Sequence, residues 1–269
     1  MKINFGTLVI IFLLVLPFHG FSKKKIKEIK VKEVAGEAIG NENESLKQVR
    51  ERAVNNAKLN ALKKAGIQEN IQTYTDYFQS ETEQEYDELF ASSVFTDIQG
   101  AVKDVEILGS NKSFTSDNML RVEVVINCTV IKYLSEADLS FDFEITGIRP
   151  NYNNDDLLTF QFTPYKEGYL RAFIFTKSES YQLYPNDYET SRLFQDKMEY
   201  AFPLEEINYR LETTKRSEIH RIVFVFIKED IPFLNKVEYE EIFNWIFSLP
   251  PDIRKVKSFS FTVFNGNGD

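Results

Sequence analysis

The chain has 269 residues, of which 43% are hydrophobic and 27% charged, a composition typical of a folded protein long enough for two compact domains. Its 32 basic and 41 acidic residues give a net charge of −9, and no basic cluster is expected on a folded face. This balance argues against nucleic-acid binding, because neutralisation of phosphates supplies most of that affinity. Cys128 is the only cysteine, which excludes an internal disulfide.

Residues 1–22 have the pattern of a secretory signal peptide. Lys2 precedes an unbroken apolar run from Leu8 to Leu16, and small residues occupy Gly20 and Ser22. We therefore predict cleavage after Ser22. This cleavage removes Lys2 and no acidic residue, so the net charge changes from −9 to −10.

The alternative is that this apolar segment stays as a membrane anchor, although about 20 apolar residues are needed to span a bilayer. Positive charge directly after the segment disfavours translocation. It comes from Lys23, Lys24, Lys25, Lys27 and Lys30. No cysteine ends the signal, so lipid attachment of the bacterial kind is not expected. We expect an exported, non-lipidated protein of the periplasm or outer-membrane surface, without a transmembrane span after cleavage, and the mass of the mature chain distinguishes the two alternatives.

The first folded half is expected to contain one long helix between extended segments. A strand from Ile26 to Ala38 is interrupted by Gly36 and ended by Gly40, and the helix follows within Asn41–Gly66. Ser45 and Gln48 form a capping box, and Gly66 provides the left-handed stop. The predicted inward stripe consists of Leu46, Val49, Ala53, Val54, Ala57, Ala61, Leu62 and Ala65.

After this helix we expect a strand over residues 67–78, an acidic helix over 80–92, an extended segment over 94–108 and a turn region over 110–118. Leu120 to Val130 then alternates apolar and polar residues, which predicts a half-buried strand. The alternation puts Cys128 on the apolar face. A buried, inert thiol is therefore favoured over a reactive one.

The order strand, helix, strand, helix, strand, strand and the helix pattern resemble a bacterial envelope family. It includes the N-terminal domain of flagellar-assembly protein T and small outer-membrane lipoproteins. The matching residues are Glu37, Ala38, Gly40, Ser45, Leu46, Arg50, Ala53, Ala57, Ala61, Ala65 and Gly66. The resemblance covers residues 26–133 and implies the fold of a helix on a short mixed sheet. The lipoprotein cysteine is missing here, and nothing in the chain indicates flagella.

The second half is expected to be rich in strands. The polar stretch Tyr133–Ser140 is the predicted junction, and Phe141 begins the β-rich part. Predicted strands cover 157–164, 169–175 and 181–184, and the tight returns between them indicate an antiparallel meander. A further strand at 219–227, a helix at 237–248 and a last strand around 256–264 complete the prediction.

A second resemblance covers residues 140–230. The run from Gly168 to Phe175, the segment from Tyr181 to Asn186, and Phe202-Pro203 resemble the bacterial domain of unknown function 4384. That family implies no known activity, and its members are often fused to envelope or signalling modules. Arg171 in the middle of the first run suggests that one face of this strand is solvated.

The residues suited to catalysis or metal binding are few. His19 leaves with the signal, and His220 is expected to be a partly exposed structural residue. No phosphate-binding loop or nucleophile elbow occurs, and a zinc site is disfavoured because such sites usually draw on several His or Cys side chains. Asn151 to Asp156 could offer oxygen ligands to Ca²⁺, but Asn and Asp clusters are ordinary turn formers, which we favour. We therefore predict no cofactor and no metal.

Tyrosines in the second half could form an aromatic platform for a glycan or protein partner, because tyrosine is amphipathic and loses little entropy on binding. The alternative is that they lie at the margins of a β-domain core, which we favour. The candidate residues are Tyr165, Tyr169, Tyr181, Tyr184 and Tyr188.

We predict an α+β fold. An N-terminal α/β sandwich, with a long helix on a short mixed sheet, precedes a β-rich, sandwich-like C-terminal domain with a late helix. The expected divisions are residues 1–22, 23–134 and 135–269. The expected function is that of an exported, non-catalytic envelope protein that binds envelope protein partners as an interaction or assembly module. The alternatives are a glycan- or peptidoglycan-binding module, and a hydrolase that uses a carboxylate pair.

Overall fold

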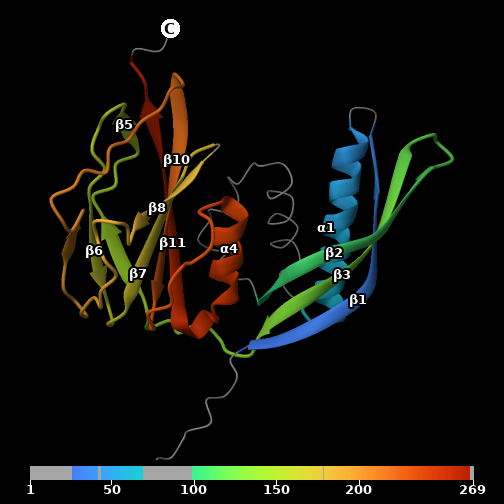
Figure 1. The fold of residues 1–269 in the computed structure, drawn as a ribbon, viewed down its shortest axis with the longest axis horizontal. Helices are drawn as coiled ribbons and strands as arrows, with labels where there is room; N and C mark the ends of the chain where they lie inside the picture. Colours follow the sequence, from blue (N-terminus) through green and yellow to red (C-terminus); the bar gives the residue numbers. More distant parts are fainter. Residues whose placement is uncertain (1–25, 42–43, 69–98, 178, 267–269) are drawn as a thin grey trace, which may run out of the picture.

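A computed structural model describes residues 26–41, 44–68, 99–177 and 179–266, and it has an α+β fold (Figure 1). The predicted segments at 67–78 and 80–92 lie wholly or largely outside these residues, as do residues 94–98 of the predicted extended segment 94–108. The N-terminal part contains β1 (Ile26–Ile39), α1 (Leu46–Lys64), β2 (Gly100–Phe114) and β3 (Leu120–Tyr133). The sheet order is β1-β3-β2, and both pairings are antiparallel.

Helix α1 packs on this sheet through small side chains. Ser45 and Gln48 form the predicted capping box, and Gly66 has φ +81°, so both helix ends are confirmed. The predicted stripe is buried at Val49, Ala53, Ala57, Ala61 and Leu62, but Leu46 is 47% exposed. Leu46 is the first residue of α1, where the side chain lies at the end of the helix and is only partly covered.

Strand β1 continues through Gly36, where an interruption was predicted. A Cβ on Gly36 would lie 2.3 Å from the carbonyl oxygen of Ala53. The missing side chain therefore lets the helix backbone approach the strand, rather than ending the strand. At the other end of the sheet, β2 continues to Phe114, so the predicted turn region shrinks to a short loop between β2 and β3.

The C-terminal part contains two further sheets. A five-stranded sheet has the order β5-β11-β10-β7-β8, and a three-stranded sheet has the order β4-β6-β9. Their strands are β4 (Phe143–Thr146), β5 (Asn151–Asn153), β6 (Phe160–Pro164), β7 (Tyr169–Phe175), β8 (Ser180–Tyr184), β9 (Tyr200–Phe202), β10 (Ser217–Ile227) and β11 (Arg254–Phe264). Aromatic rings fill the space between the sheets, as where Phe160 meets Phe224 with ring centroids 5.0 Å apart.

The meander prediction is correct only for β7 and β8, which form a hairpin. Strand β6 pairs with β4 and β9 instead of β7. The turn before Gly168 therefore carries the chain from one sheet to the other. Alternation along β6 and β7 is the same for a hairpin and for two facing sheets, so it could not distinguish them.

Helix α4 (Tyr239–Ser248) covers the other face of the five-stranded sheet and joins the two parts of the molecule. Phe173 of β7 contacts Trp245 of α4, with ring centroids 6.0 Å apart. The Tyr133 hydroxyl at the end of β3 donates a hydrogen bond to the carbonyl of Phe247. One buried apolar cluster therefore runs from α1 through the N-terminal sheet to α4 and the five-stranded sheet. Figure 1 shows α4 between the two sheets.

Both faces of β7 are consequently covered, and the expectation of a solvated face at Arg171 is wrong. Arg171 is 1% exposed. Its guanidinium donates to Asp230 Oδ1 at 2.5 Å, to Ser191 Oγ at 3.0 Å and to its neighbour's carbonyl at 2.8 Å. A buried charge of this kind is tolerated because it is paired and hydrogen-bonded.

Candidate functional site

The outer edge of β2 is the most exposed regular backbone in the N-terminal part. Every residue from Asp104 to Phe114 is solvent-exposed, including the apolar side chains of Val105, Ile107 and Leu108. Phe114 has the highest exposure of these apolar residues, at 67%. Within the part of the chain that the structure describes, no backbone hydrogen bond reaches this edge from outside the sheet between Val105 and Phe114.

The loop between β2 and β3 determines which backbone groups face outward. Asn118 N–H donates to the Thr115 carbonyl at 3.0 Å, and Thr115 N–H donates to the Met119 carbonyl at 2.9 Å. Hydrogen-bonded pairs alternate along an antiparallel ladder. Thr115 and Met119 form such a hydrogen-bonded pair, so Ser113 and Asn111 also bond to β3. The residues between them, Ser110, Lys112 and Phe114, therefore point their amide and carbonyl groups away from β3.

The opposite edge of the same sheet is covered. Four side chains of α1, spaced four residues apart, each donate to a backbone carbonyl of β1. The pairs are Arg52 with Ile39 at 2.7 Å, Asn56 with Glu37 at 2.7 Å, Asn60 with Ala35 at 2.9 Å and Lys64 with Lys32 at 3.3 Å. Side chains four apart share one helix face, so a single row of donors lies along this strand. Unpaired strand edges can recruit other chains, and α1 prevents this at β1.

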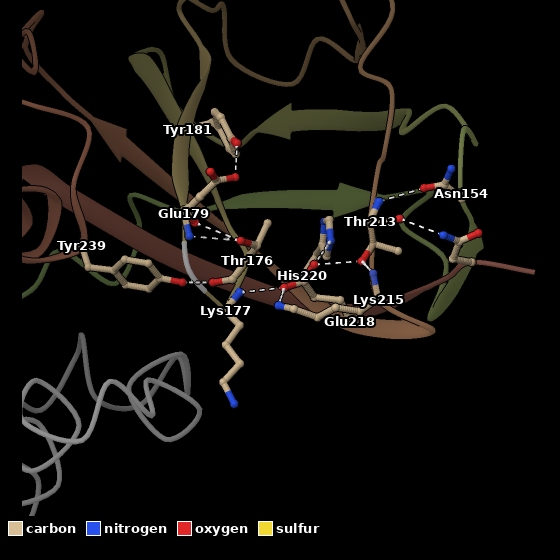
Figure 2. A network of polar contacts seen from close by, with 11 residues as sticks. Asn154, Thr176, Lys177, Glu179, Tyr181, Thr213, Lys215, Glu218, His220 and Tyr239 are labelled. Atoms are coloured by element: carbon tan, nitrogen blue, oxygen red, sulfur yellow. Dashed lines mark hydrogen bonds and ion pairs between the residues drawn. The ribbon is translucent and has the colours of Figure 1, made fainter. Parts of the chain in front are cut away.

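A second polar cluster lies at one end of the five-stranded sheet (Figure 2). Its centre is the largely buried carboxylate of Glu218, which pairs with Lys215. Glu218 also accepts from Thr213 Oγ1 at 3.0 Å and from the Lys177 amide at 3.3 Å. Burial alone raises the pKa of Glu218, but these donors stabilise the carboxylate and lower its pKa overall. The cluster joins the β7–β8 turn to the segment before β10.

His220 lies beside Glu218 and is buried, although the sequence suggested partial exposure. It is 3% exposed, its Nε2 is 3.8 Å from Glu218 Oε2, and its ring centroid is 5.7 Å from that of Phe261. Burial lowers the pKa of His220, and the Glu218 carboxylate offsets this only partly. The lowered pKa favours the neutral imidazole, and the ring is covered by its surroundings.

The Asn151–Asp156 segment forms a turn whose carboxylates have protein partners. Asp156 Oδ2 accepts from Arg149 at 3.1 Å and from the Asn153 amide at 2.9 Å. Asp155 pairs with Arg210 at 3.3 Å. Among the described residues, no group of three or more His, Cys, Asp or Glu side chains is arranged to hold a metal ion. The turn interpretation accounts for these contacts.

The five candidate tyrosines do not form one surface. Tyr169 packs against the cluster on the α4 side of the sheet, and Tyr184 is 0% exposed in the cluster on the opposite side. The Tyr184 hydroxyl donates to the carbonyl of Thr190 at 2.9 Å. Tyr165, Tyr181 and Tyr188 are exposed. For Tyr184 the core alternative is correct, because a covered ring offers no face to a ligand.

Cys128 lies on the helix-facing side of β3 and is 5% exposed, as the alternation predicted. Burial raises the pKa of its thiol. Since the thiolate is the reactive form, this cysteine is an inert part of the core.

Sequence reasoning missed the β2 edge, because it depends on strand order. The available signal was the apolar group Val105, Ile107 and Leu108, which has no obvious partner in the sequence. None of the helices in the described part has the length and apolar character that a membrane span requires. Comparison with models of protein families and with curated proteins finds no match to this chain.

Proposed function

We propose that this protein is an exported, non-catalytic component of a bacterial envelope that acts as an interaction or assembly module through the outer edge of β2. One observation carries the proposal. Helix α1 covers the β1 edge with four hydrogen bonds, whereas the β2 edge is exposed over eleven consecutive residues, Asp104 to Phe114. Exposed strand edges bind extended segments of other chains.

The non-catalytic part of the proposal rests on the surroundings of the reactive side chains. His220 and Cys128 are both buried. The carboxylates of Asp138, Asp142, Asp156 and Glu218 each accept from lysine or arginine side chains. A carboxylate-pair hydrolase instead needs two facing carboxyl groups about 5–9 Å apart around a substrate. Pairing with Lys and Arg gives these carboxylates a structural role, which supports the non-catalytic part of the proposal.

The envelope location rests on the signal-like segment 1–22 and on the residue pattern shared with the flagellar-assembly and lipoprotein family. The position of Gly36 under α1 gives that pattern a packing role, because the small residues allow the close helix–strand contact. Fractionation of native cells, with the mass of the mature chain, tests export directly.

Site-specific photocrosslinking in native cells tests the interaction function. A photoreactive phenylalanine analogue at Phe114 is expected to form adducts with a protein partner. The same analogue at Leu234, which is 83% exposed on the C-terminal part, is the control. Lys112→Pro is expected to remove the adduct at residue 114. Absence of adducts at 114, or identical adducts at both positions, contradicts the proposal.

A further inference from the structure

Resting on the proposed function, we infer the chemical class of the partner: β2 receives an acidic extended segment of another protein, which adds as a fourth strand of the N-terminal sheet. The backbone defines where it binds. The register of β2 against β3 shifts between Ile107 and Gly109 and is regular from there to Phe114. Bulges disrupt strand pairing, so the added segment is limited to the stretch between Gly109 and the loop at Thr115.

Three residues in this stretch present backbone groups outward: Ser110, Lys112 and Phe114. Each can form one hydrogen-bonded position with an added strand. Gly109 has no atom within 4 Å of the position of a Cβ, and the Phe114 ring is 67% exposed. In an alternating partner that places acidic residues opposite Lys112, the apolar side chains lie on the other face of the sheet, where Gly109 leaves room for them. These contacts compensate for the few backbone hydrogen bonds that a short binding stretch allows. We call this stretch, Gly109–Phe114, the footprint.

Charge selects an acidic partner. Lys112 occupies the middle of the footprint, and no ion pair joins it to another described residue. Opposite charges on directly facing residues of adjacent strands stabilise the pair, and like charges destabilise it. A Glu or Asp opposite Lys112 therefore makes a stabilising pair and avoids a pair of like charges.

The same lysine disfavours a second copy of this chain as the occupant. Two copies of β2 pairing antiparallel over the whole stretch Ser110–Phe114 place Lys112 opposite Lys112. Like charges in facing positions destabilise a strand pair, and lysine on an edge strand is a common protection against self-association. The structure therefore favours a different, acidic chain over a symmetric dimer.

A peptide-binding experiment with the full mature chain tests the inference. The probe is a fluorescent seven-residue peptide of alternating valine and glutamate, and its twin replaces every glutamate with lysine. We expect anisotropy titration to show at least about tenfold tighter binding of the acidic peptide, which corresponds to about 1.4 kcal/mol. Amide hydrogen exchange is expected to show protection at Ser110, Lys112 and Phe114.

Three variants sharpen the result. Lys112→Glu is expected to reverse the charge preference. Lys112→Pro removes an outward amide that makes no bond to β3, so it is expected to abolish binding while leaving the fold intact. Lys47→Glu makes the same charge change on an exposed position of α1, whose side chain is 86% exposed, and is expected to leave binding unchanged.

Equal affinity for both peptides, protection at other amides, or equal effects of Lys112→Glu and Lys47→Glu overturn the inference. Concentration-dependent dimers that Lys112→Pro abolishes also overturn it, in favour of a second copy. The two proposals fail separately. Adducts at Phe114 without a preference for the acidic peptide reject only the acidic strand, whereas peptide binding without adducts in cells rejects the interaction function.

Discussion

Gly36 of β1 lies directly beneath Ala57 of α1, and a Cβ on Gly36 would be 2.3 Å from the backbone nitrogen of Ala57. Such an approach is impossible for a real Cβ, so Gly36→Ala must move the helix away from the sheet. Overpacking of this kind costs about 1–3 kcal/mol. We expect the free energy of unfolding, measured by chemical denaturation, to fall by about 3 kcal/mol, because the atoms in the way belong to the helix backbone and cannot rotate aside.

Gly109→Ala is the matched control for this prediction, since a Cβ there meets no atom within 4 Å. Its free energy of unfolding is expected to change by less than about 1 kcal/mol, with a stabilising direction from reduced freedom of the unfolded chain. Similar losses for the two variants would show that α1 does not depend on the absence of a side chain at Gly36.

The pKa of His220 predicts a pH dependence of stability. Burial lowers this pKa in the folded state, with Glu218 opposing the shift and Lys215 adding to it. Below about pH 6.5 the unfolded chain therefore binds a proton that the folded chain does not, and stability falls as the pH falls further. One such group contributes a slope of at most about 1.4 kcal/mol per pH unit.

His220→Phe is expected to flatten this slope just below pH 6.5, as measured by denaturation at a series of pH values. Glu218 acts in a separate window, because its lowered pKa places its loss of stabilisation below about pH 4.5. An unchanged slope between about pH 6.5 and 5 in the variant would assign the dependence to other groups.

Tyr184 and Tyr188 separate core packing from surface binding. Tyr184 is 0% exposed, and its ring contacts Phe202 with centroids 5.2 Å apart, whereas Tyr188 is 74% exposed. Tyr184→Ala is expected to cost about 3–5 kcal/mol, as for other large aromatic truncations in cores. Tyr188→Ala is expected to stay within about 0.5 kcal/mol. A stable Tyr184→Ala variant would contradict its place in the core.

The Arg171–Asp230 pair predicts a coupling between two substitutions. Asp230→Ala leaves the buried guanidinium without its carboxylate, which is expected to cost about 2 kcal/mol, the range of hydrogen bonds to charged groups. The double variant with Arg171→Met removes the buried charge as well and is expected to recover part of that loss. A double-mutant cycle measures this, and strictly additive losses would show that the pair is not coupled.

Local patterns predicted the elements well where one physical requirement dominates. The capping box at Ser45, the left-handed Gly66 and the alternation that buries Cys128 each depend on neighbours in the sequence. The late helix was expected from residue 237 and begins at Tyr239. The errors occur where distant segments meet. Arg171 is buried because α4 and the Asp230 loop cover its face, and nothing near residue 171 shows this.

The sequence by itself determined the α+β class, the alanine-rich helix and the inert cysteine, because periodicity, capping and left-handed turns are properties of short segments. Only the tertiary structure decided that β6 and β7 belong to different sheets, that His220 is covered, and that β2 rather than β1 has an exposed edge. Strand order and layering depend on contacts between residues far apart in the chain, and alternation is identical for every such arrangement. The candidate site is an edge, and an edge exists only once the strands have an order.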